Sequence, residues 1–266
     1  MILARRGLVA LILGGAMALA LPAAAQTVLR VASYPANPPW EFKDEKGNFQ
    51  GFEVDIVHDI ARRLGMTPQI EGYDFKALFV ASASRRVDLV ISSLTITNER
   101  LESQSFTQPY FQGALGLAVR ADSGIGGLSD LKGKTVASIA TSFPEAWIKE
   151  RADQLGYAEY KSYDTLANLL TDLRNGRVDA IVNDIVGLRY AFTQTPGMKV
   201  VEEIVTGEKF AMMMPKNHPL LEKVNDAISQ MKTDGTMARI YRKWFGTDPA
   251  PGSLTLTPLP VPTSAD

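Results

Sequence analysis

Apolar residues recur along the chain with two different spacings, and the alternation predicts strands and helices in turn. Residues 28–32 and 89–97 are short runs rich in β-branched and other apolar residues, typical of buried strands. Residues 53–64 and 164–174 instead repeat apolar positions at helical spacing, which predicts two amphipathic helices. Strands that alternate with helices usually form mostly parallel sheets covered by helices. We therefore expect an α/β protein.

Polar residues and glycines indicate where these helices begin and end. Asp164 is a suitable N-cap for the second helix, because its side chain can accept a hydrogen bond from a free amide of the first turn. Gly65 and Gly176 follow the two helical patterns, and we expect Gly176 to adopt the left-handed conformation that ends many helices.

One phrase occurs twice in the chain, as RVDLVISS at residues 86–93 and as RVDAIVND at residues 177–184. Each copy predicts a buried strand that leaves a helix and ends in polar side chains. Ligands of open α/β sheets bind beyond the carboxyl ends of strands. The duplication therefore predicts that two α/β units present a site together, although polar residues also end many strands without any function. The residues at the two ends are Ser92, Ser93, Asn183 and Asp184.

The first residues have the three parts of a secretory signal. Two arginines stand at positions 5 and 6, residues 7–21 are apolar, and Ala23-Ala24-Ala25 provides a cleavage site. A membrane anchor is the alternative, but the apolar run is shorter than the roughly 20 residues that span a bilayer. We expect residues 1–25 to be a cleaved signal peptide and the mature protein to be periplasmic.

Charge and composition narrow the classes of partner. The whole chain has 28 basic and 29 acidic residues among 266, no cysteine and two histidines. The near balance does not favour nucleic acid or an anionic membrane as a partner. Without cysteine the fold has no disulfide and no lipid-bearing thiol. His58 and His218 are far apart in the sequence, so we expect no metal and no cofactor.

The last twenty residues differ from the rest. Prolines recur at positions 249, 251, 258, 260 and 262. Proline at this density removes backbone donors and prevents a helix or a central strand. We expect residues 247–266 to form a proline-rich, extended tail.

The chain resembles the bacterial family 3 solute-binding proteins, which bind polar amino acids for ABC transporters. The resemblance spans residues 28–249 and implies the two-lobed type II periplasmic binding fold, with a monomer that meets a membrane permease. It implies a first lobe of residues 26–114 and 208–246 and a second of 115–207, with crossings near 112–115 and 209–212. The motifs that carry it are GFEVD (51–55), SSLTITNER (92–100) with FTQPY (106–110), DLKGK (130–134) and residues 235–246.

The resemblance assigns the ligand's two charged groups to opposite lobes. Thr97 is a good N-cap, so Arg100 lies in a first helical turn, where a cation opposes the helix dipole. The resemblance implies that Arg100 binds the ligand carboxylate in a two-pronged fork. It implies that Asp184 accepts hydrogen bonds from the α-ammonium. An ion pair of Arg100 with Glu99 and a solvated loop position for Asp184 are the alternatives.

Hydroxyl groups and backbone amides complete the part of the site that binds the amino-acid backbone. The resemblance implies hydroxyl contacts from Ser92, Ser93 and Thr95. Ser142 and Glu145 form a capping-box pattern at a helix start, which offers free amides to an anion. The resemblance places backbone groups of Thr141, Ser142 and Phe143 near the ligand carboxylate.

The positions around the ligand side chain depart from the family. By resemblance Phe75 is an aromatic wall. Tyr34 replaces a common acid, Asn37 a frequent aromatic and Ile139 a residue that is often basic. Trp40 stands where many members have phenylalanine. The altered pocket predicts a neutral amino acid rather than a cationic one, unless Glu41 turns inward and supplies the missing charge.

Two other functions fit the same fold. Some relatives are cyclohexadienyl dehydratases, which need a general acid in the cleft, and Glu41 or Asp184 could fill that role. The retained ammonium-binding position favours a binding protein that is not an enzyme. A receptor that signals through its closed state would have the same sequence features, because both depend on closure driven by ligand.

Overall fold

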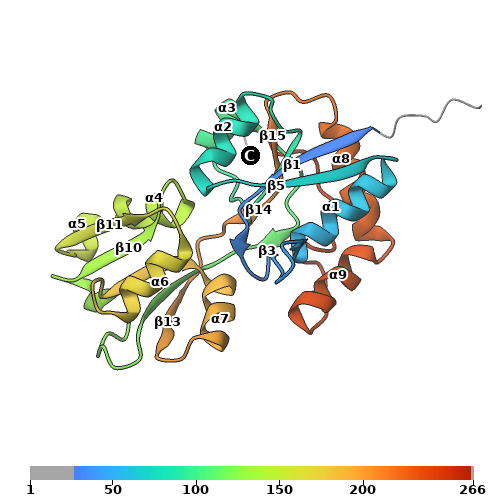
Figure 1. The fold of residues 1–266 in the computed structure, drawn as a ribbon. Coiled ribbons are helices and arrows are strands. Elements are labelled where there is room, and N and C mark those ends of the chain that lie inside the picture. Colours follow the sequence, from blue (N-terminus) through green and yellow to red (C-terminus); the bar gives the residue numbers. More distant parts are fainter. Residues whose placement is uncertain (1–26, 265–266) are drawn as a thin grey trace, which may run out of the picture.

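The computed structural model describes residues 27–264, and the expected signal peptide lies outside them. Figure 1 shows two α/β lobes joined by a narrow waist. The two-lobed α/β fold class is thereby confirmed. No helix among residues 27–264 is long and apolar enough to cross a membrane.

The first lobe is built on a five-stranded sheet of order β5-β1-β6-β15-β7. A small three-stranded sheet, β2-β3-β4, follows β1. The strands are β1 (Val28–Ser33), β2 (Ala36–Asn37), β3 (Glu41–Lys43), β4 (Phe49–Gln50), β5 (Thr67–Gly72), β6 (Leu89–Ile91), β7 (Gln104–Phe106) and β15 (Met213–Pro215). The helices are α1 (Phe52–Arg63), α2 (Phe75–Ala83), α3 (Asn98–Ser103), α8 (Leu221–Thr233) and α9 (Thr236–Phe245).

The second lobe repeats this plan with the order β11-β10-β12-β9-β13. The strands are β9 (Leu115–Arg120), β10 (Thr135–Ile139), β11 (Glu159–Tyr163), β12 (Ala180–Asp184) and β13 (Met198–Ile204). The helices are α4 (Phe143–Glu150), α5 (Ala152–Leu155), α6 (Leu166–Arg174), α7 (Ile185–Gln194) and a short 3-10 turn, η1 (Leu128–Leu131).

The repeated phrase of the sequence occupies equivalent places in the two sheets. Its two copies form β6 and β12, each third in its sheet and parallel to its neighbour β1 or β10. The sheets are mixed rather than mostly parallel: β1 also pairs in parallel with β5 and β10 with β11, whereas the pairings of β15 and of β9 with their neighbours are antiparallel. The strands that follow the two crossings, β9 and β15, run against the other strands of their sheets.

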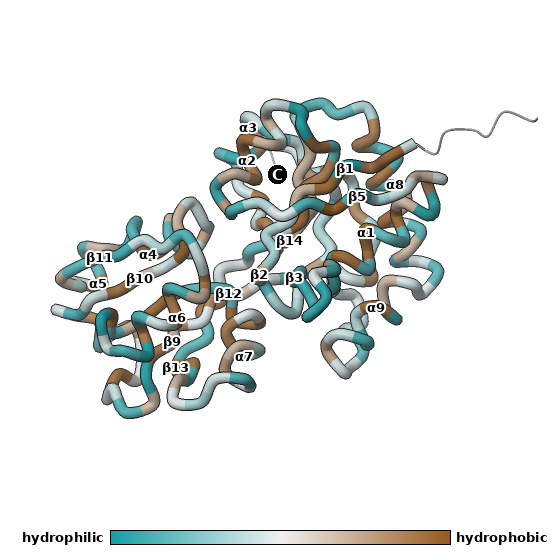
Figure 2. Tube along the Cα trace, viewed as in Figure 1, coloured by the Kyte–Doolittle hydropathy of each residue, from teal (hydrophilic) through white to brown (hydrophobic). Residues whose placement is uncertain are grey.

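Alternating strand residues are buried on both faces of each sheet. In the first lobe Leu29 and Val31 face the cluster that contains α1, α8 and α9, whereas Ala32 faces the cluster of α2. Figure 2 shows the hydrophobic segments along β1 and α1. In the second lobe Val136 faces α4 and Ala137 faces α6. Burial on both faces is what makes these strands continuous apolar runs in the sequence.

The two crossings between the lobes lie side by side. β8 (Phe111–Gln112) and β14 (Lys209–Phe210) pair in an antiparallel two-stranded ribbon. Each crossing thus supports the other at the waist, where a small change in backbone angles would rotate one lobe against the other.

Helix ends follow the sequence signals with one exception. Gly176 has φ 72°, as expected for a residue after a helix end. The N-cap of α6 is Thr165 rather than Asp164, because the Thr165 hydroxyl accepts the amide of Asn168 at 3.2 Å. Both residues are good N-caps, and the helix begins one residue later than the pattern suggested.

The proline-rich tail contains no helix or strand up to residue 264, and hydrogen bonds hold it against the first lobe. The Thr255 hydroxyl donates to the Tyr110 carbonyl at 3.0 Å, and the Leu259 amide donates to the Gln108 side chain at 2.9 Å. The buried Lys232 ammonium donates to the Thr257 carbonyl at 2.9 Å and to the Pro109 carbonyl at 2.7 Å. The tail is therefore part of the packed lobe.

Deletion of residues 250–266 should lower the free energy of unfolding by about 1–3 kcal/mol, because it removes three hydrogen bonds worth roughly 1 kcal/mol each, less the entropy of ordering the tail. Chemical denaturation measures the difference. Deletion of residues 261–266 is the matched control, since it retains all three bonds and should cost less. Equal stability of both truncated proteins and the full chain would show that the tail contacts contribute nothing.

Candidate functional site

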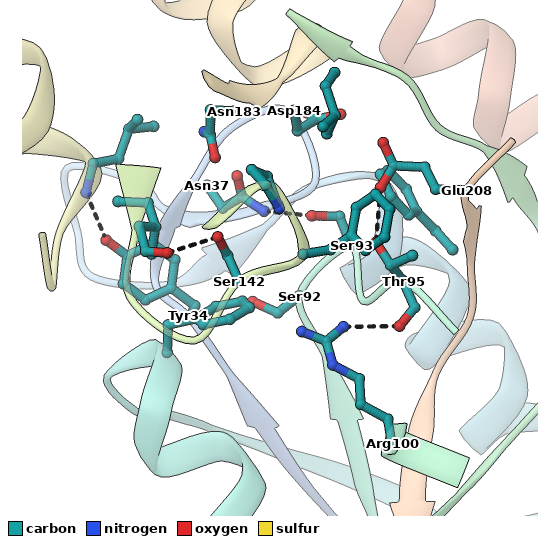
Figure 3. Close-up of a pocket in the computed structure, with 17 residues that line it drawn as sticks. Tyr34, Asn37, Ser92, Ser93, Thr95, Arg100, Ser142, Asn183, Asp184 and Glu208 are labelled. Atoms are coloured by element: carbon teal, nitrogen blue, oxygen red, sulfur yellow. Dashed lines mark hydrogen bonds between the residues drawn. The ribbon is translucent and has the colours of Figure 1, made fainter. Parts of the chain in front are cut away.

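A pocket lies between the lobes, at the ends of β6 and β12 where the repeated phrase turns polar. Figure 3 shows its lining side chains. The first lobe contributes Tyr34, Asn37, Phe75, Ser92, Ser93, Thr95 and Arg100, and the second contributes Leu115, Ile139, Ser142, Phe143, Pro144, Leu166, Asn183 and Asp184. The waist contributes Glu208 and Phe210.

Arg100 is held at the start of α3. The Thr97 hydroxyl accepts the Arg100 amide at 3.2 Å, so the expected N-cap is confirmed. The guanidinium donates to the Thr95 carbonyl at 2.8 Å and, across the lobes, to the Thr141 carbonyl at 3.2 Å. Burial lowers the pKa of Arg100 to about 10. No carboxylate among residues 27–264 forms an ion pair with it, so the alternative pairing with Glu99 is not present.

Asp184 ends β12 and begins α7. Its Oδ2 accepts the Gly187 amide at 2.7 Å and the Trp40 indole N–H at 2.9 Å. Its Oδ1 is buried without a hydrogen-bond partner in the described part of the chain. Burial raises the pKa of Asp184 to about 6, while hydrogen bonds from the Trp40 indole and from the backbone at Gly187 and Val186 oppose that rise. Since the residue is 8 % exposed, the solvated-loop alternative is wrong.

Glu208 is a third charged residue of the pocket, and sequence reasoning missed it. It lies just before β14, is 5 % exposed, and accepts the Thr95 hydroxyl on Oε2 at 2.8 Å. Its Oε1 is buried with no hydrogen-bond partner among the described residues. Burial raises the pKa of Glu208 to about 7. The one available signal was its place beside the expected crossing at residues 209–212.

A buried polar network shapes the loop after β6. Ser93 has φ 43°, and its amide donates to both carboxylate oxygens of Glu53 at 3.0 Å. This left-handed residue ends β6 at Ile91, earlier than the pattern of residues 89–97 suggested. The Ser92 hydroxyl and the Asn37 amide both donate to Glu41 Oε1 at 3.0 Å, and Asn37 also donates to Ser93.

The loop before α4 carries the expected helix cap. The Ser142 hydroxyl accepts the Glu145 amide at 3.2 Å, while Glu145 accepts the Thr141 amide at 2.6 Å. Thr141 has φ 62° and meets Arg100 through its carbonyl, but it does not line the pocket itself. Ser142 and Phe143 do line it.

The far end of the pocket is mainly apolar. Tyr34 and Phe75 meet edge to face with ring centroids 6.3 Å apart, and Ile139 lies among the lining residues of the opposite lobe. The Tyr34 hydroxyl accepts the first amide of α6, that of Leu166, at 3.2 Å. Burial raises the pKa of Tyr34, so the side chain is uncharged at neutral pH.

Two expectations about the wall need correction. Trp40 does not line the pocket: it is fully buried in the first lobe, because Phe52, Phe111 and Phe210 surround its ring. Glu41 does not line the pocket either, because Asn37 and Ser92 hold it behind the wall. Trp40 instead reaches the site through the hydrogen bond that its indole donates to Asp184.

Residues 27–264 contain no group of three histidine, aspartate or glutamate side chains that could hold a metal ion. The pocket itself offers hydrogen-bonding groups and the charged groups of Arg100, Asp184 and Glu208. Two carboxyl groups with free oxygens and one guanidinium without an acid partner suit a small ligand that has both an anionic and a cationic group.

The chain is similar to known amino-acid-binding proteins. The L-cystine-binding protein TcyJ of Escherichia coli K12 is 32% identical over 216 residues, 79% of this chain and 80% of that protein. The solved structure of an ancestral arginine-binding protein bound to arginine has a TM-score of 0.78 and 38% identity, and covers 83% of this chain and 99% of its own. A second solved structure, of an ancestral arginine-binding protein bound to glutamine, has a TM-score of 0.78 and 37% identity, and covers 84% of this chain and 99% of its own. The family model described as bacterial extracellular solute-binding proteins, family 3, matches residues 29–247, and the chain belongs to that family.

Proposed function

We propose that this protein captures an amino acid with a neutral side chain between its lobes and delivers it to the permease of an ABC transporter. It acts as a monomer in the periplasm after removal of residues 1–25, and it does not alter its ligand chemically. Residues 26–114 and 208–246 form one lobe, residues 115–207 form the other, and closure occurs about the β8–β14 ribbon.

One observation carries the proposal: Arg100 and Asp184 come from opposite lobes and reach the same pocket, each with unused hydrogen-bonding capacity. A zwitterionic amino acid satisfies both, with its carboxylate on the guanidinium and its ammonium on the aspartate. Because neither lobe holds both groups, the ligand favours the closed state through its contacts with each lobe.

The neutral side chain follows from the other end of the pocket. Tyr34, Phe75, Ile139 and Leu166 supply apolar surface there. Burying a cation among them without an acid would cost several kcal/mol. Glu208, the additional acid of the pocket, is bonded to Thr95 at the Arg100 end. The relatives named for cystine and for arginine show that the family takes both neutral and cationic ligands.

A competition series at pH 7.5 with ligand-stripped protein tests this proposal. Neutral amino acids such as glutamine and cystine should outcompete arginine, lysine and ornithine. The tightest should stabilise the protein by about 2.7 kcal/mol at 100 times its dissociation constant. Tightest binding by a basic amino acid would overturn the neutral side chain, and failure of every amino acid would overturn the proposed function.

A further inference from the structure

Two buried carboxyl groups of the pocket each keep one oxygen without a partner. These oxygens are Oδ1 of Asp184 and Oε1 of Glu208, and no donor of the described residues reaches either. Buried polar atoms are nearly always hydrogen-bonded, so two such oxygens in one pocket point to a donor that arrives with a ligand.

The two carboxyl groups are fixed from different parts of the chain. Asp184 is held by the Gly187 amide and the Trp40 indole, and Glu208 is held by the Thr95 hydroxyl. Arg100 donates to the carbonyl of the same Thr95, which places Glu208 at the Arg100 end. Figure 3 shows Tyr34 and Glu208 on opposite sides of the pocket. Glu208 is therefore near the backbone groups of an amino-acid ligand and away from its side chain.

Burial and the charges around Glu208 favour its protonated form. Burial and the neighbouring charge of Asp184 raise the pKa of Glu208, while Thr95, Thr206 and the positive charge of Arg100 lower it, with the balance at about 7. The negative charge of Glu53 also raises the pKa of Asp184. Two carboxylates that share a buried pocket do not both ionise readily, because each disfavours the charge of the other.

We propose that Glu208 is a second acceptor for the ligand's α-ammonium group, and that ligand binding drives a proton out of the pocket. The inference rests on the proposed function. An ammonium group has three donors, and the two free oxygens accept two of them. Its positive charge replaces that of the proton, so the Glu208 carboxylic acid ionises and its proton passes to the solvent.

The affinity should then depend on pH in a defined direction. With a pKa of about 7, Glu208 is ionised in about 3% of molecules at pH 5.5 and in about three quarters at pH 7.5. Because the ionised form accepts the ammonium, ionisation of Glu208 alone should raise the affinity about 25-fold over this interval.

Calorimetry in two buffers of different ionisation enthalpy measures the proton release directly. The probe is L-glutamine, or L-cystine if glutamine does not bind. At pH 6.5 the wild type should release about 0.7 of a proton per ligand through Glu208. Glu208→Gln should bind about tenfold or more weakly at pH 7.5, release fewer protons by that amount, and reduce the pH dependence of affinity to the part that Asp184 contributes. Glu102→Gln, an exposed site of the same charge, should change none of these.

The outcomes separate the two ideas. If the wild type binds an amino acid, but Glu208→Gln has the same affinity, proton release and pH profile, the role of Glu208 is overturned and the proposed function stands. If no amino acid binds the wild type, the proposed function itself fails. Weaker binding by Glu208→Gln with unchanged proton release would assign Glu208 a merely structural role and also contradict the inference.

Discussion

Arg100→Ala is expected to weaken amino-acid binding by about 30-fold to several thousand-fold. Truncating one partner of a buried charged pair costs roughly 2–5 kcal/mol, because the other charge stays buried and unpaired. In the proposed complex that other charge is the ligand carboxylate. No carboxylate of residues 27–264 forms an ion pair with the guanidinium, which leaves its charge available to the carboxylate of the proposed ligand. Titration calorimetry on the folded variant measures the loss.

Two further variants separate the role of the charge from its structural contacts. Arg100→Lys keeps a cation but loses the planar fork, and it should lose less affinity than the alanine variant. Arg62→Ala, an exposed arginine that pairs with Asp59 on α1, should leave binding unchanged. A loss of less than threefold for a folded Arg100→Ala protein would exclude Arg100 as the carboxylate-binding residue.

The repeated phrase makes much of the architecture predictable. The pattern of an apolar strand followed by polar residues occurs at residues 86–93 and again at 177–184, and this repetition indicates two similar units from the sequence alone. In the structure β6 and β12 occupy the same place in their sheets. The N-caps Thr97 and Ser142 are equally predictable from the sequence, because a helix cap depends on residues within one turn. Local features such as helix caps depend only on residues that are neighbours in the sequence.

Contacts between distant segments are harder to predict. Glu208 enters the pocket only because β14 pairs with β8, which places the segment before it beside Thr95. Trp40 was expected at the ligand, yet the rings of Phe111 and Phe210, far along the chain, enclose it. The periodicity of the sequence does not indicate which aromatic residues pack in one cluster. A large aromatic residue close to a pocket residue in the sequence is compatible both with the pocket wall and with the core of the lobe.

Trp40→Ala is expected to cause the largest loss of stability, about 3–5 kcal/mol, because removing a large buried aromatic residue leaves a cavity. The Trp40 ring is fully buried, and it meets Phe52, Phe111, Phe210 and Phe245 edge to face at centroid distances of 4.7–5.8 Å. Denaturant unfolding of the ligand-free protein measures the difference. A loss below 1 kcal/mol would show that this aromatic cluster does not stabilise the lobe.

Trp40→Phe separates the packing of the ring from its hydrogen bond to the other lobe. A phenyl ring keeps part of the aromatic contacts, whereas the indole donor to Asp184 is lost and Oδ2 retains the Gly187 amide. A hydrogen bond to a charged group contributes about 1.5–3 kcal/mol, so binding should weaken about tenfold or more while stability falls less than in Trp40→Ala. The pKa of Asp184 should rise further, since the indole N–H favours its ionised form. Unchanged affinity in this variant would mean that the orientation of Asp184 does not depend on the first lobe, and that its α7 amide alone holds the carboxylate in place.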